Sequence, residues 1–467
     1  MKNINLKHLF KKNFTLILLV PLILNFLYNL FTLNFFQRLL NFDLINLGST
    51  LILFFILFFV GKATAKTFNF QMISTGILFY FCFMFLFDNV FLFVSKNFSF
   101  SILFYISNAL FFIYLLLKKK SHTELILLSL FFILNLGYVQ IFFEEFNFSI
   151  VKKGDVAVQW FPMAQNIYNK NYFFSLTNPF LDGYGQLISY SHAVLLKINL
   201  NLNNYEYVRS TTNVLYFLSI FLMTELKISK KNKLLSILIF TILVLNSDWF
   251  NYLFIDSLMG EGIVSYFFAV AFLSVFNSKS SNSKIILTLF GTIYFTKQFV
   301  TILVLIVCFS FFIFKKTRKS AVYAFIPFFI NEINLITNLT TSRRDAYASN
   351  FDFRDTILDL LTNTNLKLEN AVIIFKNLIK DVPFTYLLVL FILSLIFYII
   401  KSQTLSQEFL TLIVTFTLNL LLILLLYISA WRNMPELESP IRYMLNLFHL
   451  VVAYIFINFD FFENSTK

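Results

Sequence analysis

Long apolar segments separated by short polar loops run through most of the chain. Many of these segments approach the roughly 20 apolar residues that a helix needs to cross a bilayer. We therefore predict an all-α, polytopic integral membrane protein with about 12–14 transmembrane helices in one membrane domain, residues 1–467. The predicted spans are residues 13–35, 44–61, 68–88, 98–117, 124–143, 211–226, 234–250, 258–276, 285–296, 298–314, 320–337, 384–400, 409–430 and 443–460.

The longest early polar interruption, residues 144–210, is predicted to be a large outer loop. Within it Gly154-Asp155 opens a run in which Val156, Trp160, Met163 and Ile167 recur at spacings of three and four. That spacing predicts an interfacial helix with its apolar side in lipid. The same pattern divides the domain into N-terminal helices (1–143), this loop, core helices (211–337), a second outer loop (338–383) and C-terminal helices (384–460).

One stretch of the pattern, residues 284–314, has two interpretations. Thr296-Lys297-Gln298 interrupts an apolar run of about thirty residues, which is either one span or a hairpin of two. One span would place the cationic cluster 315–319 outside. We favour the hairpin, because it keeps that cluster with the other lysine loops on the inner side.

Composition and charge agree with a membrane protein. The chain is 58% hydrophobic and only 13% charged, and its net charge of +13 comes largely from lysines in short loops. This distribution is typical of membrane orientation and argues against a nucleic-acid partner. It places both termini in the cytoplasm, and we expect the chain in a bacterial inner membrane. Cys82 and Cys308 lie inside apolar runs and are expected to be small hydrophobic residues rather than disulfide or metal-site partners.

Three acidic residues at predicted helix starts are candidates for chemistry. Asp155 opens the interfacial helix, where it is either a helix cap or a functional carboxylate. Glu261 opens the span 258–276, where a first-turn acid is also expected from helix electrostatics. Asp256 lies nearby and could exchange roles with Glu261.

Two cationic residues are candidates for binding an anion. Lys297 lies between two apolar half-spans, where a charge is costly, so that it either has a partner or extends to the headgroups. Arg442 begins the last span beside Tyr443, where it either binds a phosphate through two parallel hydrogen bonds or anchors the helix at the interface.

Three further polar residues have structural and functional interpretations. His192, in the first outer loop, is a substrate-binding candidate or a polar surface residue. His449 in the last span is expected to form hydrogen bonds within the bundle. Glu332, between Asn331 and Asn334, is expected to face the bundle interior.

Five short motifs, in order, resemble the GT-C superfamily of membrane glycosyltransferases, in particular the dolichyl-phosphate-mannose-protein mannosyltransferases. These are G-D with P-M-A-Q-N-I-Y in the first outer loop, N-P-F-L-D-G-Y-G-Q-L after it, Glu261 at the start of a span, F-T-K-Q-F-V, and I-R-Y-M-L-N-L-F. In that family the acidic loop follows the first span, whereas here it follows the fifth. The usual second acid of the loop and the Pro after R-Y are replaced here.

The resemblance implies that the protein transfers a sugar from a polyprenyl-phosphate donor, with inversion, on the outer face of the membrane. Asp155 or Glu261 would then be catalytic, and Arg442, Tyr443, Lys297, Asp256 and His192 would bind substrate. Nothing in the sequence requires a metal or another cofactor, and the acceptor is not specified. Two other classes share many of these features: a flippase or exporter of lipid-linked saccharides, and a polysaccharide polymerase or ligase.

Overall fold

The computed structural model describes residues 44–91, 100–118, 164, 167, 186–198, 204–245, 261–277, 282–296, 298–313, 321–329, 369, 371–373, 375–376, 379–380, 382–401, 406–428 and 445–464. All regular elements in these residues are helical, which confirms the predicted all-α class. They are α3 (Leu44–Phe68), α4 (Ile73–Phe91), α5 (Phe100–Leu117), α9 (Gln186–Ile198), α10 (Asn204–Glu225), α11 (Lys230–Leu245), α13 (Glu261–Asn277), α14 (Ser283–Thr292), η4 (Ile293–Phe295), α15 (Gln298–Ile313), η5 (Val322–Phe325), α20 (Val382–Lys401), α21 (Gln407–Ile428) and α23 (Phe448–Asn464).

The first described helix is longer than the pattern predicts. The predicted span ends at residue 61, but α3 continues to Phe68. Lys62 and Lys66 are exposed, whereas Ala63, Thr64 and Ala65 between them are buried. The lysines therefore occupy the outer side of a continuing helix, and the charge that we used to end the span does not end the helix.

A hydrogen-bonded turn ends α3 and sets the direction of α4. The Phe70 N–H donates to the Ala65 carbonyl at 2.8 Å, and Asn69 has a positive φ of 55°. This is the Schellman arrangement, in which a residue in the left-handed region follows the last turn of a helix. Asn tolerates that region better than most residues with a side chain, so that the chain reverses here within four residues.

Two glycines allow α3 and α4 to pack closely. A Cβ atom added to Gly76 would lie 2.0 Å from the Gly61 carbonyl oxygen, so that no larger residue fits without a shift of the backbone. Close contact between small residues is a general way for helices to associate in an apolar environment. The pair therefore fixes the distance between these two helices.

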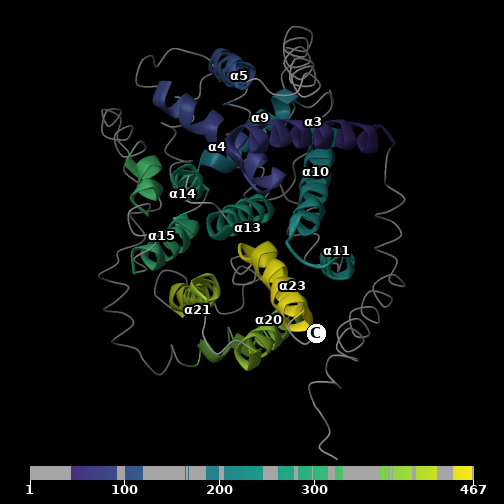
Figure 1. The fold of residues 1–467 in the computed structure, drawn as a ribbon, viewed down its shortest axis with the longest axis vertical. Helices are drawn as coiled ribbons and strands as arrows, with labels where there is room; N and C mark the ends of the chain where they lie inside the picture. The colour runs from purple at the N-terminus through teal and green to yellow at the C-terminus, as the bar shows by residue number, and fades with distance from the viewer. Residues whose placement is uncertain are drawn as a thin grey trace, which may run out of the picture.

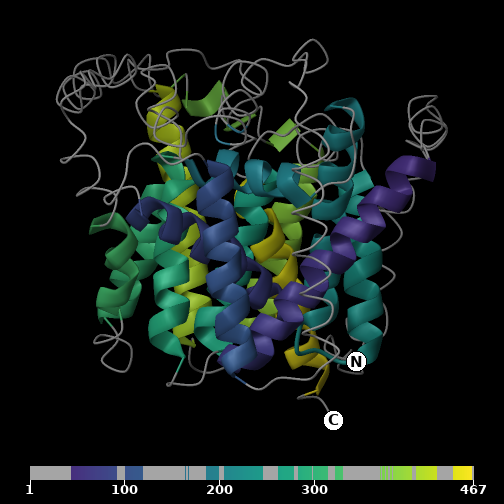
Figure 2. The ribbon, with the colours of Figure 1, turned by 90° about the horizontal axis from the view of Figure 1, so that it is seen from above.

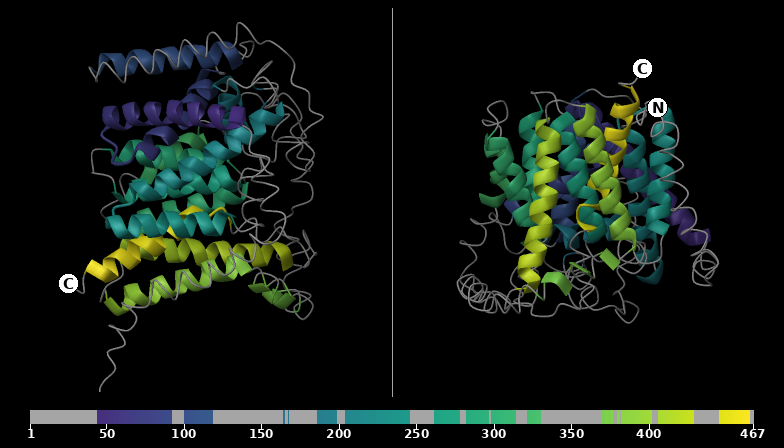
Figure 3. Two further views of the ribbon diagram at one scale, coloured as in Figure 1. Left: turned by 90° about the vertical axis from the view of Figure 1, so that its right-hand side faces the viewer. Right: turned by 90° about the horizontal axis from the view of Figure 1, so that it is seen from below.

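The central helix of the described bundle is α13, which is surrounded by α4, α10, α14 and α23 (Figure 1). Its side chains from Ile263 to Leu273 are all buried. Figure 3 shows the helices lying side by side, with α5 at one edge of the molecule and α20 at the opposite edge. A helix that is apolar on all sides is expected at the centre of such a bundle.

Residues 284–314, which the sequence pattern allowed to be one span or a hairpin, form a hairpin, as we favoured. α14 and α15 are separate helices joined through η4 and Thr296. Asn282 at the start of α14 donates to the Phe68 carbonyl at 2.7 Å, and the Lys284 ammonium lies 5.1 Å from the ring centre of Tyr323, which follows α15 along the chain. The chain therefore returns through α15 to the end of the bundle at which α14 begins.

The outward faces of several helices carry apolar side chains. On α20 the exposed large hydrophobic residues recur every three or four positions, at Val389, Ile392, Ile396 and Ile399. Figure 2 shows that the helices run roughly along one common direction, with α3 inclined across them. Among the described stretches, Leu51–Phe68 is long and apolar enough to cross a membrane, and shorter apolar helices such as Gly262–Asn277 accompany it.

Polar contacts distinguish the two ends of the bundle. We call one the lysine end, where the turn 69–72, the link 226–229 and Asn282 lie together: the Lys227 ammonium donates to Gln71, and Asn282 bonds to the end of α3. We call the other the Asp88 end, where the last turns of α4 meet α9 and η4.

Candidate functional site

The Asp88 end holds a helix that the sequence pattern did not predict. α9 (Gln186–Ile198) comes from the predicted outer loop, but its residues from Leu187 to Val194 are almost completely buried. It packs against α4, α10 and η4. Its sequence Q-L-I-S-Y-S-H-A mixes polar residues with apolar ones. This helix is therefore part of the bundle and not a surface segment.

A buried carboxyl group on α4 faces this helix. Asp88 is fully buried, and the Tyr190 hydroxyl on α9 donates to its Oδ2 atom. Its other oxygen, Oδ1, has no hydrogen-bond partner among the described residues. Ser189, next to Tyr190 in the chain, is also fully buried, and its hydroxyl has no hydrogen-bond partner in the same part of the chain. Buried polar atoms are normally paired, so that unpaired ones at one end of a bundle indicate a place for a ligand or water.

Aromatic rings lie beside this carboxyl group. The ring centre of Phe85, one turn before Asp88, is 5.4 Å from that of Tyr190 and 5.1 Å from that of Phe295 in η4. Thr296, which is fully buried, follows η4. The tip of the hairpin is thereby held against the last turns of α4, because the Phe85 and Phe295 rings pack directly on each other.

His449 occupies a separate, deeper position in the bundle. Its Nδ1 atom lies 2.8 Å from the Ser265 hydroxyl and its Nε2 atom 2.7 Å from the Ser219 hydroxyl. The Ser219 hydroxyl donates to the Leu215 carbonyl, so its oxygen is left to accept a hydrogen bond from the Nε2–H group. Both ring nitrogens of His449 are therefore paired, which confirms the expected hydrogen bonding within the bundle.

The lysine end is organised by a carboxylate from a distant part of the chain. Glu225, the last residue of α10, accepts hydrogen bonds from the backbone N–H groups of Ile73 (2.5 Å) and Ser74 (2.9 Å). These are free donors in the first turn of α4, where a negative charge is favourable. A second carboxyl group, Glu408, accepts a hydrogen bond from the Tyr454 hydroxyl.

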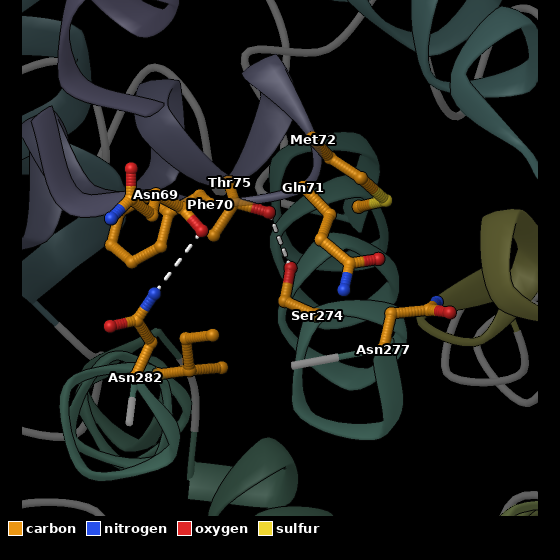
Figure 4. A pocket seen from close by; sticks show the side chains of 9 residues that line it. Asn69, Phe70, Gln71, Met72, Thr75, Ser274, Asn277 and Asn282 are labelled. Atoms are coloured by element: carbon orange, nitrogen blue, oxygen red, sulfur yellow. Dashed lines mark hydrogen bonds between the residues drawn. The ribbon is translucent and has the colours of Figure 1, made fainter. Parts of the chain in front are cut away.

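A small polar cavity also lies at the lysine end. Its volume is about 10 Å³, which is enough for one water molecule. Figure 4 shows the amide side chains of Asn69, Gln71 and Asn277 around it, with the Thr75 hydroxyl bonded to that of Ser274 at 2.5 Å. The cavity is too small for a sugar or a lipid headgroup, so we assign it to bound water.

Five of the predicted site residues lie outside the described residues: Asp155, Asp256, Lys297, Arg442 and Tyr443. Their roles stay predictions, as does the interior position of Glu332.

Two other predicted site residues, Glu261 and His192, lie in the described part of the chain. α13 begins at Glu261, as predicted, although the side chain of Glu261 lies outside the description. His192 is on α9 and only 2% exposed, so that its interpretation as a polar surface residue is wrong. Ile167, predicted to face lipid from the interfacial helix, is instead fully buried by protein.

The sequence analysis missed Asp88 and Tyr190. Asp88 is the last residue of the predicted span 68–88, and an acid at the end of an apolar run ordinarily marks the boundary with water. The apolar character of Phe91 and Phe93 beyond Asp88 was the available signal that the segment continues. The buried thiols of Cys82 and Cys308 are free, as predicted.

Within the described residues, no group of three or more His, Cys, Asp or Glu side chains is arranged to hold a metal ion. No family model, curated protein or solved structure matches the chain.

Proposed function

We propose that this protein is a polytopic membrane glycosyltransferase of the GT-C type, which moves a sugar from a polyprenyl-phosphate donor to an acceptor at the outer face of the membrane. One observation supports the proposal: Glu261 and Thr296, the described residues of two of the five motifs, lie at the end of the bundle opposite the lysine-bearing links. α13 ends at Asn277 beside Gln71, so Glu261 at its start belongs to the far end. Thr296, the residue before Lys297, follows η4 at that same end.

The exposed side chains support a position within a bilayer. The stripe on α20 is matched on α21 by Leu410, Val414, Leu418 and Leu421, all of them more than a third exposed. A water-facing helix side would carry polar residues at these positions. Lysine loops at one end would then mark the cytoplasmic side, because short cytoplasmic loops are enriched in Lys and Arg.

The proposed reaction is a displacement at the anomeric carbon of the donor. An acceptor hydroxyl oxygen forms a bond to that carbon as the bond between the carbon and the phosphate oxygen breaks, and the configuration inverts. The proton of the hydroxyl passes to the Asp155 carboxylate, a role typically worth about 10²–10⁴-fold in rate. The phosphate leaves with the bonding electrons, and its charge is stabilised by Arg442 and Lys297.

The decisive substitution is Asp155→Asn, because Asn caps a helix about as well as Asp but does not take up a proton. We expect this variant to accumulate normally and bind donor, yet to transfer sugar at least about 10²-fold more slowly. Transfer is measured with purified protein in nanodiscs, using radiolabelled undecaprenyl-phosphate-linked glucose, mannose and arabinose with membrane extract as the source of acceptor. Asp155→Ala is the control for capping, with an expected loss of about 0.5–2 kcal/mol in stability.

The result separates the proposal from its alternatives. An Asn variant with normal turnover would remove Asp155 from the mechanism and make Glu261 the better candidate. A wild-type protein that moves intact lipid-linked sugar across a vesicle membrane without breaking the phosphate–sugar bond would be a flippase, and the transferase proposal would be wrong.

A further inference from the structure

The unpaired oxygen of Asp88 is the feature that the proposed reaction leaves unexplained. Asp88 is fully buried, Tyr190 occupies only Oδ2, and Oδ1 has no hydrogen-bond partner among the described residues. A buried carboxyl oxygen without a partner is unfavourable whether or not the group carries a proton. Within the described part of the chain the site is therefore incomplete, and a hydrogen-bonding ligand would complete it.

The surroundings indicate what kind of ligand fits. The ring of Phe85, one turn before Asp88, packs against the rings of both Tyr190 and Phe295, so that aromatic side chains gather at the end of α4 that carries the carboxyl group. Ring faces pack on the C–H faces of a sugar, and a carboxyl oxygen can accept from or donate to a sugar hydroxyl. No other hydrogen-bonding partner on a described residue competes for Oδ1. A few polar atoms in a mostly apolar wall are typical of small-molecule sites.

We propose that Asp88, positioned by Tyr190, is a hydrogen-bonding contact for the sugar of the lipid-linked donor, and that Phe85 and Phe295 form part of the wall of this sugar subsite. The inference rests on the proposed function, because it assigns a donor sugar to the Asp88 end. It adds Asp88, a residue on α4, to the substrate-binding residues that the sequence resemblance implies.

The chain contains a matched pair for comparison. At the lysine end the Tyr454 hydroxyl donates to Glu408, just as Tyr190 does to Asp88, and Tyr454 is also buried. Both are carboxyl–phenol pairs between two helices, but they lie at opposite ends of the bundle. Unlike Asp88, Glu408 has no fully buried oxygen that lacks a hydrogen-bond partner. Substitutions there disturb the same chemistry without touching the proposed subsite.

The test compares the binding of lipids with and without a sugar. Wild-type protein and the variants Asp88→Leu, Tyr190→Phe, Glu408→Leu and Tyr454→Phe are placed in nanodiscs. Dissociation constants are measured for undecaprenyl phosphate and for undecaprenyl phosphate linked to glucose, mannose or arabinose.

We expect wild type to bind at least one sugar-linked lipid more tightly than the sugar-free lipid. Asp88→Leu should weaken that binding about tenfold and leave the sugar-free lipid unaffected, and Tyr190→Phe should weaken it about two- to tenfold. The two variants at the lysine end should bind both lipids as wild type does.

Several results would overturn the inference. One is sugar-selective binding that survives in folded Asp88→Leu and Tyr190→Phe; another is an equal loss for both lipids, which would make Asp88 a purely structural residue. A wild-type protein that does not distinguish the lipids overturns it too. Should Asp88→Leu fail to fold, Tyr190→Phe, which removes one hydroxyl, decides alone. Selective binding by wild type without any sugar transfer would instead refute the transferase and leave the sugar subsite in place.

Discussion

His449 is a polar side chain inside this bundle that is satisfied by specific partners. Its two ring nitrogens and its backbone N–H all contact serine hydroxyls, from Ser219 on α10 and Ser265 on α13. The Ser219 hydroxyl donates to the Leu215 carbonyl, which leaves its oxygen to accept from the imidazole. The three helices that carry these residues are thereby joined near the start of α23.

We expect His449→Phe to reduce the free energy of unfolding by roughly 2–4 kcal/mol, because two hydrogen bonds are lost and two buried hydroxyls lose a partner. Thermal unfolding in detergent would measure the loss. Replacing both serines by Ala in the same variant should recover part of it, since no buried hydroxyl is then left unpaired. No recovery in the triple variant would show that the histidine stabilises the bundle by packing alone.

For single residues, the sequence predicted the burial of His449 but not that of Asp88. His449 lies in the middle of a long apolar run, and such a residue must find a partner inside the bundle. Asp88 lies at the edge of an apolar run, where the same residue type is ordinarily solvated. Only the packing of α9, which the hydropathy pattern does not reveal, shows that Asp88 is buried.

Helix elements were predicted well where one apolar run forms one helix. α5, α13, α20 and α21 begin and end within a few residues of the predicted spans. α9 was missed because it is short and mixes polar with apolar residues, so that no apolar run long enough for a span marks it. α10 begins at Asn204, seven residues before its predicted span, because its first turns are polar. Tertiary packing, not periodicity, decides these cases.

The contact between α3 and α4 gives a prediction about helix packing. Gly76→Val places methyl groups against the backbone of Gly61, where a single Cβ would already lie 2.0 Å from a carbonyl oxygen. The helices must separate, and we expect a loss of stability of at least about 1–3 kcal/mol, as for other overpacked sites. Ile52→Ala, on the exposed side of α3, is the control and should change stability by less than about 0.5 kcal/mol. Equal thermal stability of Gly76→Val and wild type in detergent would show that the two helices are not in close contact.

For the whole molecule, the arrangement of the lysine links leads to a prediction about topology. The link 226–229, the turn 69–72 and the start of α14 meet at one end, so we expect them on the same side of the membrane. In a variant without native cysteines, single cysteines at Ser175 and Ser349 should react with an impermeant thiol reagent in intact cells. Cysteines at Ser280 and Ser406 should react only after permeabilisation. The opposite pattern would invert the orientation and move the proposed sugar site to the cytoplasm.

The hydrogen bonds of Glu225 also determine when the lysine end can be completed during synthesis. The N–H groups that it binds belong to Ile73 and Ser74, about 150 positions earlier in the chain. At roughly 5–20 residues per second, about 8–30 s pass between the synthesis of these two partners. During that time α3 and α4 are already present, but the first turn of α4 lacks its acceptor. The newly made N-terminal helices therefore wait for α10, and chains that stop before residue 225 leave this junction open to chaperones and proteases.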